Sequence, residues 1–242
     1  MLVMFTDFGC HGPYLGQMQA VLRRQAPNID VIDLINNAPA TDPRHSAYLL
    51  AALARWWPPG TVFVCVVDPG VGSDRLPVVL EAEGKWFVGP DNGLLNVVAK
   101  KASSPVCWYE IIWRPEKMSF SFHGRDLFAP TAAKIATGKG HEWLQCWQGP
   151  DLSAWQEDLN EVIYIDHYGN VITGIEYREC LAGKVLQAGN RQIAFGKTFS
   201  HVPQGIPLWY RNSMGLVEIA VNQGRADDLL ALAIGSPVTF SI

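Results

Sequence analysis

The sequence predicts an α/β protein of two domains: an N-terminal α/β sandwich with a largely parallel sheet, followed by a smaller C-terminal antiparallel, barrel-like β domain. Two observations support this fold class. The first 140 residues alternate short apolar runs with stretches of helical spacing, the pattern of strands connected by helices. From residue 161 onward, short strand-like runs are separated by Gly and Asn turns, which is typical of a small antiparallel barrel or sandwich. We therefore place the domains at 1–145 and 161–242, with an irregular linker at 146–160.

The N-terminal strands are expected where apolar runs stop at turn residues. Residues 61–67 (TVFVCVV) are β-branched or apolar throughout, so we expect a central strand that is buried on both faces. The expected strands are 2–5, 29–35, 61–67, 86–89 and 107–112.

Helices are expected between these strands. Residues 14–25 place apolar side chains at helical spacing. Asp42 and Pro43 offer an N-cap and a first-turn proline for a helix over 43–57. A third helix is expected over 127–138, with Asp126 as its N-cap.

The C-terminal domain is expected to consist mainly of short strands. They are predicted within EVIYIDHYGNVITGI (161–175), KVLQAGNRQIAF (184–195) and GLVEIAVN (215–222). Residues 226–235 predict one short helix.

Composition excludes several classes of partner. The formal net charge of -4 argues against a nucleic-acid partner, which would favour a basic face. No apolar run reaches the roughly 18 residues that a membrane span needs, and residues 1–9 lack the basic region of a signal peptide. The five cysteines are widely spaced without a CxxC pair, so we expect free thiols, a cytoplasmic location and no zinc site.

Acidic residues follow three of the predicted strands: Asp7, Asp68 and Asp91. Ligands of such sheets bind beyond the carboxyl ends of the strands, so we expect these turns to share one site.

Two segments add further chemistry to this edge of the sheet. VVDPGVGSDR (66–75) contains Asp68 and Arg75, and FHGRD (122–126) contains His123. An imidazole can accept a proton from water near neutral pH, and an Arg beside a carboxylate keeps that carboxylate ionised. Together the three side chains predict a device that holds and activates a water or hydroxide.

Each of these residues also has a structural interpretation. Asp7 can bind a ribose diol or cap the turn that follows it, and composition does not choose between the two. Taken alone, Arg75 is most often a solvated cation and His123 a structural histidine. Their joint presence in turns favours a site.

The second domain holds two weaker candidates. Asp166 and Asn170 flank a Gly turn, and taken alone they are better interpreted as an ordinary hairpin. Ser213, which precedes the apolar run at 215–222, has the same status.

The ordered set of segments resembles one known family over nearly the whole chain. The segments are TDFG (6–9), PPGTVFVCVVDPGVGSDR (58–75), GPDNG (89–93), FHGRDLFAP (122–130), DHYGN (166–170) and NSMGLVEIAVN (212–222). The set is similar to the S-adenosylmethionine hydroxide adenosyltransferases, relatives of the S-adenosylmethionine-dependent fluorinase and chlorinase. The resemblance implies hydrolysis of S-adenosylmethionine to adenosine and methionine, with no cofactor, in a homotrimer whose sites lie between subunits.

The resemblance also implies roles for individual residues. It assigns an Asp-Arg-His triad to Asp68, Arg75 and His123, and ribose binding to Asp7. In the second domain it assigns the methionine amine to Asp166, adenine to Asn170 and the methionine end to Ser213.

Three positions distinguish branches of this family. The family often has Asp where this chain has Gly12, in the region that holds the methionine end. The halogenase branch would have Tyr at position 68 and Ser at position 124, whereas this chain has Asp68 and Gly124. The chain is therefore similar to the hydroxide branch.

Three alternatives stay open at this stage. One is a halogenase-like enzyme. Another is a metal-assisted hydrolase with Asp7, Asp68, Asp91 and His123 as ligands. The third is a sensor that binds a nucleoside or S-adenosylmethionine without turnover.

Overall fold

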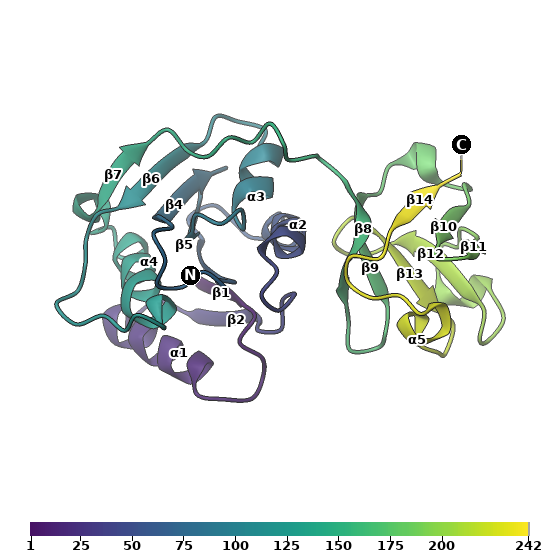
Figure 1. Ribbon diagram of the computed structural model, residues 1–242, viewed down its shortest axis with the longest axis horizontal. Coiled ribbons are helices and arrows are strands. Elements are labelled where there is room, and N and C mark those ends of the chain that lie inside the picture. Colours follow the sequence, from purple (N-terminus) through teal and green to yellow (C-terminus); the bar gives the residue numbers. More distant parts are fainter. Residues whose placement is uncertain (242) are drawn as a thin grey trace. The chain divides into compact units, whose positions relative to one another are not determined.

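The computed structural model describes residues 1–241, which divide into two compact units, residues 1–155 and 156–241 (Figure 1). The linker predicted at 146–160 begins inside a strand, because Leu144–Trp147 still pairs with the N-terminal sheet. The next strand begins at Leu159, so the irregular connection covers 148–158.

The first unit is built on a seven-stranded sheet in the order β2-β1-β3-β5-β4-β6-β7. The strands β2, β1, β3 and β5 pair in parallel, whereas β4 and β7 each run antiparallel to their neighbours, so the sheet is largely parallel as predicted. The strands are β1 (Leu2–Thr6), β2 (Val31–Ile35), β3 (Val62–Val66), β4 (Pro77–Ala82), β5 (Lys85–Pro90), β6 (Cys107–Ile111) and β7 (Leu144–Trp147).

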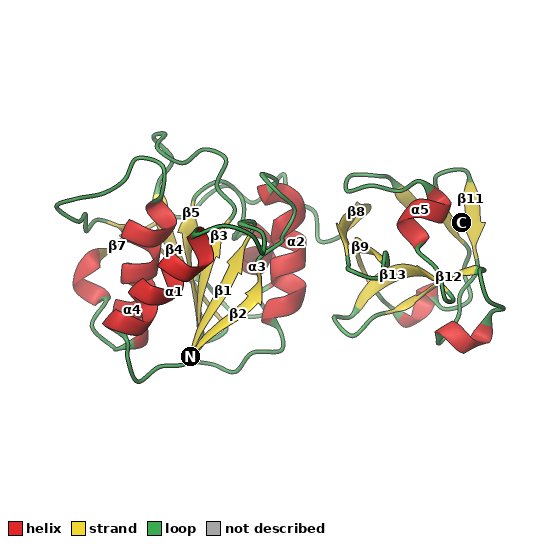
Figure 2. Cartoon of the chain, turned by 90° about the horizontal axis from the view of Figure 1, so that it is seen from below, coloured by secondary structure: helices red, strands yellow, loops and turns green. Residues whose placement is uncertain are grey.

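Helices cover both faces of this sheet (Figure 2). On one face α1 packs against α4, and on the other α2 packs against α3. The helices are α1 (Tyr14–Gln25), α2 (Pro43–Ala54), α3 (Asn96–Lys101) and α4 (Ala129–Ala136), with a π-helical turn at Gly124–Phe128 and a short 3-10 helix at His141–Trp143. The central strands β1 and β3 are buried along their whole length, because both faces of the sheet are covered.

Most elements predicted for this unit are present. The helix predicted at 14–25 has these bounds, and Asp42 caps α2 by accepting a hydrogen bond from the backbone N–H of His45 at 3.1 Å. The prediction for Asp126 was wrong, since this residue lies inside the π-helical turn rather than before a helix. Its carboxylate instead accepts hydrogen bonds from the Ser119 backbone and the Arg125 guanidinium.

The second unit contains two antiparallel sheets, in the orders β12-β13-β9-β8 and β11-β10-β14. The strands are β8 (Leu159–Ile165), β9 (Val171–Glu176), β10 (Leu186–Ala188), β11 (Arg191–Ile193), β12 (Pro207–Arg211), β13 (Leu216–Val221) and β14 (Val238–Phe240). The fully buried Trp209 lies at the centre of their apolar core. Closure of these sheets into a barrel stays a prediction.

Short helices complete the second unit. The helix predicted over 226–235 is limited to α5 (Ala226–Leu230), because Ala231 takes a left-handed conformation with φ 50°. Two 3-10 helices lie at Glu179–Leu181 and Phe199–His201. Within residues 1–241 no helix is long and apolar enough to cross a membrane.

Candidate active site

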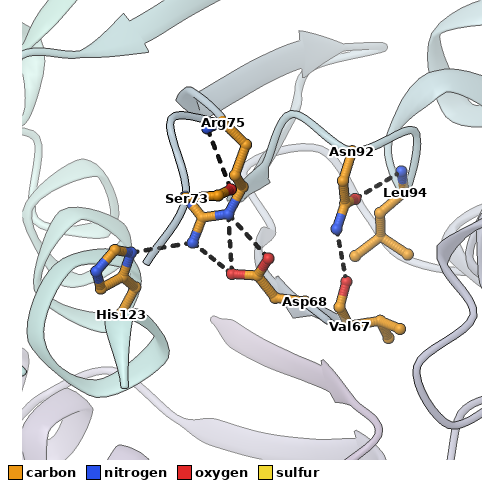
Figure 3. A network of polar contacts seen from close by, with 7 residues as sticks. All are labelled: Val67, Asp68, Ser73, Arg75, Asn92, Leu94 and His123. Atoms are coloured by element: carbon orange, nitrogen blue, oxygen red, sulfur yellow. Dashed lines mark hydrogen bonds and ion pairs between the residues drawn. The ribbon is translucent and has the colours of Figure 1, made fainter. Parts of the chain in front are cut away.

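The first unit brings Asp68, Arg75 and His123 together from loops at one edge of the sheet (Figure 3). Asp68 follows β3, Arg75 precedes β4, and His123 precedes the π-helical turn. The sequence predicted that these three side chains share one place, and the structure brings them together.

Arg75 divides its donors between the other two side chains. Its Nε donates to Oδ1 and Oδ2 of Asp68 at 2.8 and 3.0 Å, and its Nη2 also donates to Oδ2. The same Nη2 lies 3.0 Å from Nδ1 of His123. The side chains of Asp68 and Arg75 are only 4 % and 9 % exposed, so each charge depends on the other for compensation.

The Arg75 contact fixes the tautomer of His123. A guanidinium can only donate, so Nδ1 of His123 must accept, and the proton of a neutral imidazole must then reside on Nε2. Nε2 itself is buried and has no hydrogen-bond partner within the described chain. The site therefore presents an unused N–H donor.

Electrostatics keep this imidazole neutral. Burial lowers the pKa of His123 below its usual value, and the positive charge of Arg75 lowers it further. Protonation would place a hydrogen on Nδ1, facing the guanidinium, so it would break the Arg75 contact.

Two residues outside the predicted set support the cluster. Asn92 donates from Nδ2 to the Val67 carbonyl at 2.9 Å, and its Oδ1 accepts from the Leu94 backbone at 3.2 Å, which anchors the backbone just before Asp68 (Figure 3). Gly72 has φ +84°, and a Cβ there would lie 2.8 Å from the Phe120 carbonyl oxygen, so a glycine lets the loop before Arg75 approach the loop before His123. The sequence marked Asp91-Asn92-Gly93 as a turn, but only the contact with Val67 identifies Asn92 as its supporting residue.

Asp7 lies beside this cluster. It lines a cavity of about 100 Å³ together with Thr41, Asp68 and His123. Its Oδ2 accepts a hydrogen bond from the Thr41 backbone N–H at 2.9 Å, and burial raises the pKa of its carboxyl group. Thr41 adopts φ 57°, so a strained backbone supplies this donor from a segment 34 residues away. This contact is not the turn cap considered above, because the partner does not belong to the turn that follows Asp7.

The three predicted binding residues of the second domain share a different and larger cavity. Asp166, Asn170 and Ser213 line a cavity of about 1020 Å³ in the second unit. Its wall is partly aromatic, with Tyr164 and Tyr210 among the lining residues. An aromatic cavity of this size with a few polar groups is typical of a site for a small organic molecule.

Asp166 also shapes the turn between β8 and β9. Its Oδ1 accepts from the backbone N–H groups of Tyr168 and Asn170, both at 2.9 Å, and its Oδ2 accepts from Asn170 Nδ2 at 3.0 Å. The interpretation of this motif as a hairpin turn is therefore correct. The same carboxylate still lines the cavity, so the turn holds a negative charge where a ligand can reach it.

Gly12 lies in the exposed turn between β1 and α1 with φ +114°. A residue with a side chain would be strained in this conformation. The backbone conformation at position 12 is thus one that favours glycine over the Asp often found there in the family.

No group of three or more His, Cys, Asp or Glu side chains is placed to hold a metal ion among residues 1–241. Both oxygens of Asp68, one of the ligands considered for a metal, already accept hydrogen bonds from Arg75.

These features define a class of protein: an α/β unit with a buried Asp-Arg-His cluster, joined to a β unit with a ligand-sized cavity. Family models describe both parts. Residues 2–145 match the SAM hydroxide adenosyltransferase N-terminal domain, and residues 160–239 match the C-terminal domain of the same family. The chain therefore belongs to the SAM hydroxide adenosyltransferase family.

Individual relatives agree with this assignment. Proteins from Thermus thermophilus and Salinispora arenicola, each named (R)-S-adenosyl-L-methionine hydrolase, are both 36% identical to this chain. The first alignment covers 96% of each chain, and the second covers 95% of this chain and 93% of the relative. A fluorinase from Actinopolyspora mzabensis is more distant, at 23% identity over 92% of this chain and 90% of that protein.

The fold has also been seen in a solved structure. A crystal structure of an uncharacterized conserved protein from Thermotoga maritima matches this chain with a TM-score of 0.89 and 30% sequence identity, covering 100% of both chains.

Proposed function

We propose that this protein hydrolyses S-adenosylmethionine at C5′ by an SN2-type attack of water or hydroxide. The balanced reaction converts S-adenosylmethionine, a sulfonium cation, and water into adenosine, methionine and a proton. The observation that carries the proposal is the Arg75 guanidinium held between Asp68 and His123, in a chain that matches both domain models of the SAM hydroxide adenosyltransferase family.

The substrate itself explains why so few catalytic groups suffice. A sulfonium leaves as a neutral thioether, so the leaving side needs no general acid and no metal. The protein must instead supply an oriented oxygen nucleophile in line with the C5′–S bond. We accordingly propose that the reaction uses no cofactor.

The cluster has a specific way to orient that nucleophile. Nε2–H of His123 can donate a hydrogen bond to the oxygen of water or hydroxide, and Arg75 holds the ring in the tautomer that does so. Asp68 keeps the guanidinium in place and compensates its charge. In this arrangement His123 donates a hydrogen bond to the nucleophile and does not remove its proton. The proton of the reaction passes to solvent, either before attack when hydroxide is the nucleophile or from the newly formed oxonium at O5′ when water is. Exclusion of bulk water strengthens such interactions.

The same geometry disfavours a halogenase. The Asp68 carboxylate compensates the charge of Arg75 and would repel a halide anion held beside it. Position 124 is also crowded, since a Cβ there would lie 3.2 Å from the Met18 sulfur and 3.5 Å from the Phe8 ring, which leaves little space for a serine.

Substrate contacts are proposed for both units. Asp7 would bind the ribose diol. In the second unit Asp166 would bind the methionine amine, Asn170 the adenine, and Ser213 the methionine end. A cavity with aromatic walls and a carboxylate suits a ligand that carries a flat base and a cationic amino acid.

We further propose that the protein acts as a homotrimer in which each site combines the first unit of one subunit with the second unit of a neighbour. Cyclic symmetry would then build three identical sites from one chain.

The reaction is tested by its products. Incubation with S-adenosylmethionine in ¹⁸O-labelled water should yield methionine and adenosine with the label on O5′, because water is the nucleophile. Activity should survive exhaustive chelation. Formation of S-adenosylhomocysteine would instead indicate methyl transfer, loss of activity with chelator would indicate a metal-assisted hydrolase, and binding without any product would indicate a sensor.

The donor role of His123 is tested by a pair of substitutions. His123→Ala should slow turnover by roughly 10²–10³-fold, the usual loss when one positioned hydrogen-bond donor to a reacting oxygen is removed. His123→Gln keeps an N–H near the position of Nε2, so it should retain at least about tenfold more activity than the Ala variant. Equal losses in single-turnover rates of the two variants would favour a general base over a donor.

The pH dependence of turnover follows from the lowered pKa of His123. Because the folded-state pKa lies below 6.5, the imidazole stays neutral as the pH falls to 6.5. Protonation of Nδ1 at lower pH breaks the contact with Arg75 that positions the ring, so kcat should decline only there. The unfolded chain binds this proton first, so the free energy of unfolding also decreases below pH 6.5. A kcat profile should therefore be recorded with circular dichroism at each pH, and an acid limb centred above 6.5 in folded protein would contradict the assignment.

Sharing of sites between subunits is tested by complementation. A His123→Ala chain and an Asp166→Asn chain should each be nearly inactive, and both substitutions avoid leaving a buried guanidinium unpaired. Co-assembled mixtures should regain part of the activity, because some sites combine an intact first unit with an intact second unit. Co-assembly shown by mass spectrometry without recovered activity would mean that each chain builds its own site.

A further inference from the structure

Glu218 is a buried acidic residue in the cavity of the second unit. It lies on β13, its residue is only 5 % exposed, and it lines the cavity together with Asp166 and Ser213. The roles proposed above for this cavity leave it unused.

Two donors hold the Glu218 carboxylate. Tyr210 faces Glu218 directly across the β12–β13 pair, and its hydroxyl donates to Oε1. Asn212 donates from Nδ2 to Oε2 at 3.0 Å. Each carboxylate oxygen thus has its own donor from the β12 side of the hairpin.

Asn212 in turn holds the connection between β12 and β13. Its Oδ1 accepts hydrogen bonds from the backbone N–H groups of Met214 at 3.0 Å and Leu216 at 2.9 Å. Its own backbone N–H donates to the Leu216 carbonyl at 2.9 Å. Ser213 lies inside this connection and is exposed to the cavity.

These hydrogen bonds connect Glu218, through Asn212, to the backbone of the turn that contains Ser213. We propose that Glu218 is a positioning residue: by holding Tyr210 and Asn212 it fixes the 212–215 turn, and thereby sets the affinity of the cavity for the methionine end of the substrate. This inference rests on the proposed function of the cavity.

The charge of Glu218 fits this role. An ionised carboxylate accepts hydrogen bonds at both oxygens, as Tyr210 and Asn212 require. Burial raises the pKa of Glu218, and the nearby Asp166 raises it further, while the two donors act in the opposite direction. A methionine of similar length offers neither Tyr210 nor Asn212 a comparable acceptor, whereas a glutamine could keep both contacts by accepting from Asn212 and donating to the Tyr210 hydroxyl.

Glu218→Met, which removes both acceptor oxygens, is therefore the decisive variant. In ligand-free protein, amide hydrogen exchange at Met214 and Leu216 should become at least tenfold faster, with no change in β8. The KM for S-adenosylmethionine should rise at least tenfold while kcat stays within about threefold, because the cluster of the first unit is untouched. Binding of adenosine, which lacks the methionine end, should change less than threefold.

A matched control is available in the same unit. Tyr177 donates to Glu179 at 3.2 Å in an exposed pair outside the cavity, so Glu179→Met should alter none of these values. Tyr210→Phe, which removes one donor and keeps the ring, provides a milder second variant if Glu218→Met does not fold. It should raise KM by a smaller factor in the same direction.

The outcomes are distinct. Unchanged exchange at Met214 and Leu216 would overturn the positioning role, and faster exchange with an unchanged KM would overturn its link to the methionine end. An equal loss of adenosine and S-adenosylmethionine binding would indicate general disruption of the unit and also contradict the proposal. If the wild-type protein formed no adenosine, the proposed function would fail, whereas the exchange data would still decide whether Glu218 holds the turn.

Discussion

The proposed chemistry depends on one arginine that donates to two partners. Arg75 binds both oxygens of Asp68 and also donates to Nδ1 of His123. The first contact compensates a charge that is almost fully buried, and the second determines which imidazole nitrogen carries a proton. If Asp68 were lost, the guanidinium would be left unpaired, and the histidine would lose the partner that fixes its tautomer. The three residues must therefore be understood as one unit, and single substitutions in it will not give additive effects.

The parallel sheet explains how these residues meet. Thr6 and Val66 are paired neighbours at the ends of β1 and β3, so Asp7 and the loop containing Asp68 leave the sheet side by side. The Arg75 and His123 loops then close over this edge, which the left-handed Gly72 permits by allowing close approach to Phe120. The parallel arrangement that defines the fold therefore also places the site, because it brings the carboxyl ends of neighbouring strands, and the loops that follow them, to one edge of the sheet.

Much of this could be predicted from the sequence, for identifiable reasons. The run at 61–67 is apolar throughout, and the spacing at 14–25 is strongly helical, so β3 and α1 gave clear signals. The strands β4 and β7 were missed, since neither Pro77–Ala82 nor the four residues of β7 show a clear alternating pattern. Asp126 was misassigned because an Asp before an apolar run is typical of a cap, and only three-dimensional contacts reveal its binding to Ser119.

The finer parts of the site could not be predicted, because they depend on distances between segments far apart in the chain. The Thr41 donor to Asp7 and the Asn92 contact with Val67 leave no local pattern. Glu218 is the one polar residue of an apolar strand, a pattern that predicts a side chain facing solvent. In the structure it is buried and accepts hydrogen bonds from Tyr210 and Asn212. Burying the Glu218 carboxylate costs free energy, which hydrogen bonds from two uncharged donors offset only in part. In this cavity it stabilises the turn that carries Ser213, so the second unit, like the first, uses a buried charge to hold a side chain that a ligand can reach.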